Sequence, residues 1–156
     1  MKRTAVILLL VIPFLGFSQL SKKQKKSIDK YTETMCTCVN DLMSTLHPKA
    51  SEVVLLMAEK GEEAAMKEVE AMLGGMSKEE MTKFLEAFTT MEDPAFIAKI
   101  EACDDKGSMA EGIKSDIDNM KGDAYTHFMA YMKENSSCDL MRSLYELGVE
   151  ESQGGE

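Results

Sequence analysis

Tryptophan is absent from this sequence, and histidine occurs only twice. Neither histidine lies in a recognisable catalytic motif, so a serine or cysteine nucleophile has no evident base to activate it. The aromatic residues are six phenylalanines and four tyrosines, whereas methionine occurs fourteen times. We therefore expect a core of aliphatic and thioether side chains rather than an aromatic one.

Motifs that bind phosphate or calcium are also lacking. The glycines at 74 and 75 follow no strand and precede no lysine-serine pair, both of which a phosphate loop requires. Asp116 and Asp118 resemble the start of a calcium loop, but Met120 occupies the third acidic position and the glycine is displaced to Gly122. We therefore expect no enzyme activity and no cofactor.

Acidic residues outnumber basic residues in this sequence. The chain has 18 lysines and arginines against 27 acidic residues, a formal net charge of −9. Such a chain repels phosphate backbones overall, so we expect no nucleic-acid partner. The exception is the segment 21–30, SKKQKKSIDK, which holds five lysines and one acid. We interpret it as a solvated helix start or a frayed arm, with contact to an anionic membrane surface as the alternative.

The N-terminus has the features of a secretion signal. Lys2 and Arg3 precede an uncharged apolar run over 4–17, and the small residues Gly16 and Ser18 lie three positions and one position before a cleavage site between Ser18 and Gln19. We predict a signal peptide over 1–18 and export to the periplasm or the cell exterior. Its removal leaves 16 basic and 27 acidic residues, a net charge of −11. The alternative is an uncleaved anchor, the one case in which we expect the protein at a membrane.

Apolar residues recur at helical spacing almost throughout the chain, and no run alternates with a period of two over the length of a strand. The first predicted helix covers 27–46. Pro48 ends it and begins the next, because proline disfavours helical geometry in the preceding residue and suits a first helical turn. The segment 49–73 follows, with a break expected near Gly61.

Turn signals divide the rest of the chain into short helices. Ser77 and Glu80 form a capping box, and Asp93 followed by proline opens another helix. The last helix is expected to end at Gly148, with 149–156 as a disordered acidic tail. The prediction is an all-α fold: a compact irregular bundle of six or seven short helices in a single helical domain over 19–148, stapled by two disulfides.

Four cysteines remain after signal removal, Cys36, Cys38, Cys103 and Cys138, and an even number in an exported chain predicts disulfides. On a helix, Cys36 and Cys38 differ by about 200° around the axis, so they cannot easily bond to each other. Two pairings stay open: 36–103 with 38–138, or 36–138 with 38–103. Either one would fix the first helix to two later parts of the chain.

A thiol redox or copper-binding protein is the alternative interpretation. Cys36 and Cys38 would act with the methionines, and His127, Met129 and Met132 offer imidazole and thioether ligands that suit Cu(I). However, the spacing of the two cysteines is not that of thioredoxin-like or zinc sites, and many methionines occupy positions where a helix needs an apolar residue. We therefore favour four structural cysteines and no metal.

The two histidines have simpler explanations. His127 follows Asp123 by four residues on a predicted helix, so we expect the two side chains to pair at the surface. We expect His47 to lie at a helix C-terminus, where a positive charge is favourable. The favoured function is a small exported binding or interaction module, whose partner is an unknown protein or a small apolar ligand held between methionine-lined helices.

Overall fold

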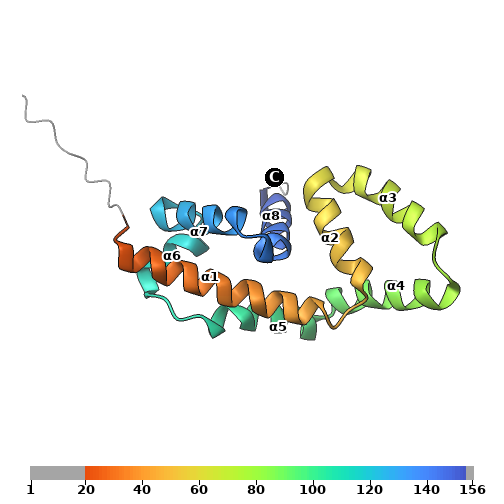
Figure 1. The fold of residues 1–156 in the computed structure, drawn as a ribbon, viewed down its shortest axis with the longest axis horizontal. Coiled ribbons are helices and arrows are strands. Elements are labelled where there is room, and N and C mark those ends of the chain that lie inside the picture. Colours follow the sequence, from red (N-terminus) through yellow and green to blue (C-terminus); the bar gives the residue numbers. More distant parts are fainter. Residues whose placement is uncertain (1–19, 154–156) are drawn as a thin grey trace, which may run out of the picture.

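The chain is helical, without a strand, throughout the part that the structure describes. This computed structural model describes residues 20–153, with side chains up to residue 147. Eight α-helices and one short 3-10 helix follow one another (Figure 1). They are α1 (Lys22–Met43), α2 (Pro48–Lys60), α3 (Glu62–Gly74), α4 (Lys78–Glu92), α5 (Pro94–Lys106), α6 (Glu111–Asp118), α7 (Gly122–Glu134), η1 (Ser136–Cys138) and α8 (Asp139–Gln153). The all-α prediction is confirmed, whereas the expected six or seven helices are too few.

The additional helix results from a complete break at Gly61. This residue has φ 77° and ψ 164°, a conformation open to glycine and strained for other residues. It ends α2 and is the N-cap of α3, so the segment predicted over 49–73 forms two helices that pack on each other. At the other end of α2, His47 is the N-cap, and its Nδ1 accepts a hydrogen bond from the Lys49 N–H at 3.3 Å. Its predicted position at a helix C-terminus is therefore wrong.

Helix α1 begins at Lys22, earlier than the predicted start at Ser27. A capping box explains the difference: the Oγ of Ser21 accepts from the Gln24 N–H at 3.3 Å, and the Oε1 of Gln24 accepts from the Ser21 N–H at 2.9 Å. Two N–H groups that the helix leaves free are satisfied in this way. The lysine-rich segment is therefore the capped start of a helix.

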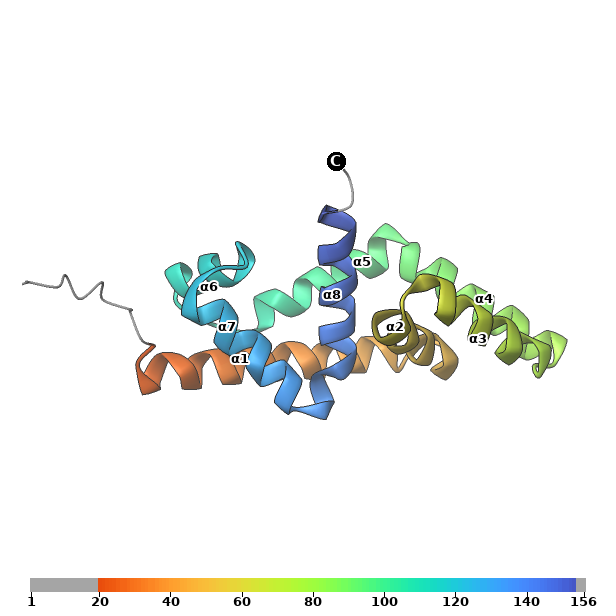
Figure 2. The same ribbon diagram turned by 90° about the horizontal axis from the view of Figure 1, so that it is seen from above.

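Most other elements pack on α1. Helices α5, α7 and α8 all contact it, and Figure 2 shows α8 crossing it. The main core combines Ile28 and Met43 of α1 with Phe128 and Met132 of α7, each of them at most 1% exposed. Thioether and aliphatic side chains thus make up much of this core, but three aromatic residues, Phe128 among them, are buried in it as well, so the prediction of a core without aromatic character holds only in part.

Helices α2, α3 and α4 share a second, smaller core. Val53 of α2, Val69 of α3 and Phe84 of α4 form its centre. In Figure 1, α3 and α4 extend away from the rest of the molecule, beyond the C-terminal end of α1. Because nothing in the described part covers the outside of this arm, Met66 on α3 and Leu85 on α4 are 47% and 52% exposed. The described helices therefore have two cores, where the sequence predicts one compact bundle.

The C-terminal helix is longer than the sequence predicts. Helix α8 continues past Gly148 to Gln153, so the predicted disordered tail over 149–156 is wrong for its first residues. A glycine inside a helix costs about 1 kcal/mol relative to alanine, which weakens the helix without ending it. Residues 154–156 and the predicted signal over 1–18 lie outside the described residues, so the signal and the domain limits 19–148 stay predictions. Between residues 20 and 153, no helix has the length and apolar character needed to cross a membrane.

Candidate functional site

The four cysteines form two disulfides. Cys36 bonds to Cys138 with an S–S distance of 2.09 Å, and Cys38 bonds to Cys103 at 2.08 Å. The structure thus selects one of the two pairings that the sequence leaves open. All four side chains are at most 6% exposed. Their burial favours a role as cross-links over thiol exchange, which needs an accessible sulfur.

The residues proposed as copper ligands in the alternative interpretation take part in disulfides or in the core instead. Cys36 and Cys38 are bonded to different partners, so neither offers a thiolate. Met132 is fully buried in the main core, and Met129 packs against the same core. Within the part of the chain that the structure describes, no three His, Cys, Asp or Glu side chains are grouped so that they could hold a metal ion.

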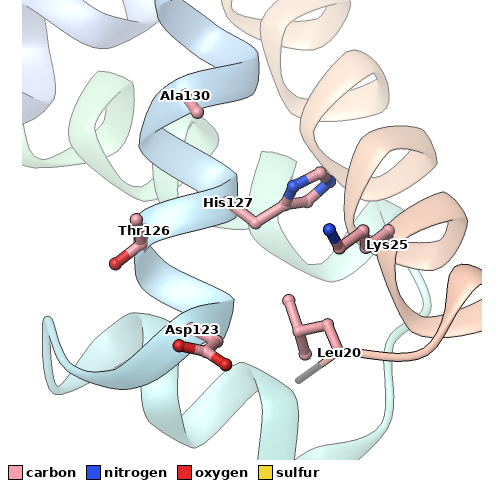
Figure 3. A pocket seen from close by; sticks show the side chains of 6 residues that line it. All are labelled: Leu20, Lys25, Asp123, Thr126, His127 and Ala130. Carbon is pink, nitrogen blue, oxygen red and sulfur yellow. The ribbon is translucent and has the colours of Figure 1, made fainter. Parts of the chain in front are cut away.

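His127 pairs with a residue of another helix. Its Nε2 lies 2.7 Å from Oδ1 of Asp29 on α1, so the predicted pairing with Asp123 is wrong. Figure 3 shows the ring directed toward α1 beside Lys25, away from Asp123 at the start of α7. A hollow of about 420 Å³ adjoins it, with Leu20, Thr126 and Ala130 also in its lining. Asp29 and His127 use each other as partners, so this pair links α1 to α7 rather than offering a free imidazole.

A longer depression runs along the contact between α2 and α8. Two hollows of about 590 Å³ and 370 Å³, both open to solvent, share Leu55 of α2 and Asp139 of α8 in their linings. We call the two hollows together the α2–α8 groove. Apolar side chains from α1, α2, α8 and the turn between α1 and α2 line the larger hollow: Met43, Leu46, Pro48, Leu55 and Leu140.

Charged side chains line the smaller hollow. Glu59 of α2 and Asp139 and Glu146 of α8 stand there with one cation, Arg142. The Nη2 of Arg142 donates to Oδ1 of Asp139 at 3.3 Å, while its Nε is buried and lacks a hydrogen-bond partner among the described residues. Carboxylates therefore outnumber cations in this part of the groove, next to an apolar surface.

The walls of the groove are tied together at the start of α8. Cys138 directly precedes Asp139, so its bond to Cys36 fixes this end of α8 to the middle of α1. A second link lies nearby, because Nδ2 of Asn40 donates to the carbonyl oxygen of Ser137 at 2.7 Å. Two of the helices that border the groove, α1 and α8, are thus joined by a covalent bond.

Comparison of the chain with protein-family models, with curated proteins and with solved structures finds no match in any of the three.

The sequence does not predict the groove, because it depends on the packing of α8 beside α1 and α2, which lie far from α8 along the chain. One local signal was present. Residues 53–57, VVLLM, are apolar all round the helix, a pattern typical of a helix with neighbours on more than one side. Val53 lies in the small core and Val54 in the main core, while Leu55, 36% exposed, lines the groove.

Proposed function

We propose that this chain is an exported helical module that binds a partner protein, and that the α2–α8 groove receives an apolar and basic segment of that partner. The observation that carries the proposal is the combination of Leu46, Leu55 and Leu140 with the carboxylates of Glu59 and Glu146 in adjoining hollows. An amphipathic helix with leucines on one side and lysines beside them offers the complementary surface.

A chain segment suits the groove better than a small apolar ligand does. Sites for small molecules enclose most of the ligand surface, whereas both hollows of the groove are open to solvent. The Cys36–Cys138 bond also holds two walls of the groove before the partner arrives. Binding to walls that are already ordered loses less conformational entropy than binding to mobile ones.

Export is supported by two observations of different kinds. The uncharged apolar run over 4–17 follows two basic residues, as in secretion signals. The two buried disulfides suit an oxidising compartment, where such bonds persist. Burial of all four sulfurs favours this binding role over the thiol redox alternative.

The experiment measures binding of a synthetic amphipathic peptide of leucine and lysine to the oxidised protein, expressed as the full chain and used in the form the cell produces. Leu55→Gln should raise the Kd at least about tenfold, because it removes an apolar contact from the middle of the groove. Leu85→Gln is the matched control, since Leu85 is exposed on α4 and does not line the groove. It should bind as the unchanged protein does, as measured by isothermal titration calorimetry.

Charge is tested with a second pair of variants. Glu59→Gln with Glu146→Gln should weaken binding of the leucine-lysine peptide several-fold. The control, Glu70→Gln with Glu101→Gln, removes the same charge from exposed positions outside the groove and should have a much smaller effect. Equal losses for target and control variants would contradict the proposal. So would tighter binding of a peptide with glutamate in place of lysine.

A further inference from the structure

We propose that the start of α1 is a second binding surface, which contacts an anionic lipid surface through the lysine face, defined as Lys22, Lys23, Lys26 and Lys30. Residues of an α-helix are separated by about 100° around its axis, which places these four within about 100° of arc. All four are exposed, whereas Ile28 on the other side of the helix is fully buried. The lysine face is thus a single positive stripe directed to solvent.

The charge of this stripe is not neutralised within the described residues. None of its four lysines takes part in an ion pair there. The one carboxylate of the segment 21–30, Asp29, is bound to His127 of α7. Farther along the helix, Glu33 and Asp41 return to the same side, so the positive patch is confined to the start of α1. A concentrated patch of this kind in a chain of net charge −9 favours an anionic partner.

The backbone that carries these lysines is already helical before binding. The capping box of Ser21 and Gln24 keeps the first turn helical, so the lysine face exists as a surface rather than as a frayed arm. A patch that is already ordered loses little conformational entropy when it binds.

The position of the patch along the chain favours lipid as its partner. The uncharged apolar run over 4–17 ends five residues before Lys22, a distance of at most about 18 Å along an extended chain. In a chain that keeps this run in a bilayer, the lysine face lies within reach of the headgroups; in the cleaved chain, the charge of the face alone attracts an anionic lipid surface. Clusters of four or more lysines beside an apolar segment or on a helix attract anionic lipids.

Lipid contact at the lysine face leaves the α2–α8 groove free. The groove begins at Asn40 and Met43, near the C-terminal end of α1. The two surfaces are therefore independent, and the membrane proposal can fail without affecting the groove. If both hold, the protein presents its groove to partners while it rests on a membrane.

The test measures partitioning onto vesicles of phosphatidylglycerol mixed with phosphatidylcholine, and onto phosphatidylcholine alone, for the protein as produced from the full chain. Each lysine near an anionic surface strengthens partitioning about fivefold. Changing all four residues of the lysine face to glutamine should therefore reduce binding to the anionic vesicles by at least about a hundredfold, and salt should reduce binding of the unchanged protein. Changing the same four residues to arginine keeps the charge and should preserve binding.

A matched control distinguishes the effect of the lysine face from the effect of the total charge of the protein. Lys78, Lys99, Lys121 and Lys133 are exposed lysines elsewhere, and changing these four to glutamine removes the same total charge. This control should bind nearly as the unchanged protein does. Equal losses in the two glutamine variants, equal binding to neutral vesicles, or no binding to anionic vesicles would each overturn the proposal. Self-association at low salt that only the lysine-face variant abolishes, without vesicle binding, would assign the patch to a second copy instead.

Discussion

Cys36 and Cys138 are bonded across 102 residues, and this bond joins α1 to the start of α8 beside the α2–α8 groove. Cys38 projects from another side of α1 and bonds to Cys103 of α5, which does not line the groove. Helix α1 is therefore cross-linked in two directions, and only one of the two bonds borders the proposed site. The contribution of each bond can be measured separately.

Removal of either disulfide should destabilise the protein by a similar amount. The bonds span 102 and 65 residues, and loop-closure entropy depends only weakly on length, so each is worth up to about 4 to 5 kcal/mol. Cys36→Ala with Cys138→Ala, and Cys38→Ala with Cys103→Ala, should lower the free energy of unfolding in urea to nearly the same extent. A difference larger than about 2 kcal/mol would show that local packing, rather than loop closure, dominates one of them.

Gly107 should not tolerate a side chain, because a Cβ placed on it would lie 2.4 Å from Cδ2 of Tyr31. Tyr31 is 3% exposed and cannot move away freely. Gly107→Ala should therefore lower the free energy of unfolding by about 1 to 3 kcal/mol. Gly112→Ala is the control, since no atom lies within 4 Å of the added Cβ, and it should raise stability by about 0.4 to 1 kcal/mol. Equal stability of the two variants in urea denaturation would show that α1, which carries Tyr31, and the end of α5 at Gly107 can move apart without a cost in free energy.

Asp104 should determine the titration of Lys114. Asp104 accepts hydrogen bonds from Lys114 and from the Tyr31 hydroxyl, and the bond to Asp104 raises the pKa of Lys114 above its ordinary value of 10.5. Because this pKa is raised on folding, protonated Lys114 stabilises the fold at pH values below 10.5, and the contribution is lost as the pH rises through the folded-state pKa.

Asp104→Asn should therefore lower the pKa of Lys114 toward the ordinary value, as measured by NMR titration of the lysine side chain. Asp105→Asn is the control, because Asp105 acts on Lys114 only through a weak charge interaction. An unchanged pKa in the Asp104→Asn variant would show that the contact between the two side chains does not persist in solution.

Local signals predicted many of the helix ends. Pro48, Gly61 and Ser77 mark helix boundaries in the structure, because a fixed φ angle, a positive φ angle and a capping hydrogen bond, respectively, each act over a few residues. The Ser21 cap was equally visible in the sequence. The predicted helix nonetheless begins at Ser27, because lysines interrupt the apolar pattern before that residue and the sequence leaves the segment 21–30 open between a helix start and a frayed arm.

Helical geometry predicts in which directions side chains of one helix point, but it does not predict which other helix they contact. The divergence of Cys36 from Cys38 follows from their spacing, but the choice of partner depends on which helix packs on each side of α1. In the same way, His127 could have paired within its own helix, yet α1 brings Asp29 to it. The α2–α8 groove required the positions of α1, α2 and α8 together, which no local pattern encodes.

The most direct test of the proposed function compares binding of the leucine-lysine peptide by the two disulfide variants, at a temperature where both are folded. The variant without Cys36–Cys138 should bind at least about tenfold more weakly than the unchanged protein, because the start of α8 is no longer held beside the groove. The variant without Cys38–Cys103, similarly destabilised, should retain its affinity. Equal affinities in the two variants, or the larger loss in the second, would contradict the assignment of the groove as the binding site.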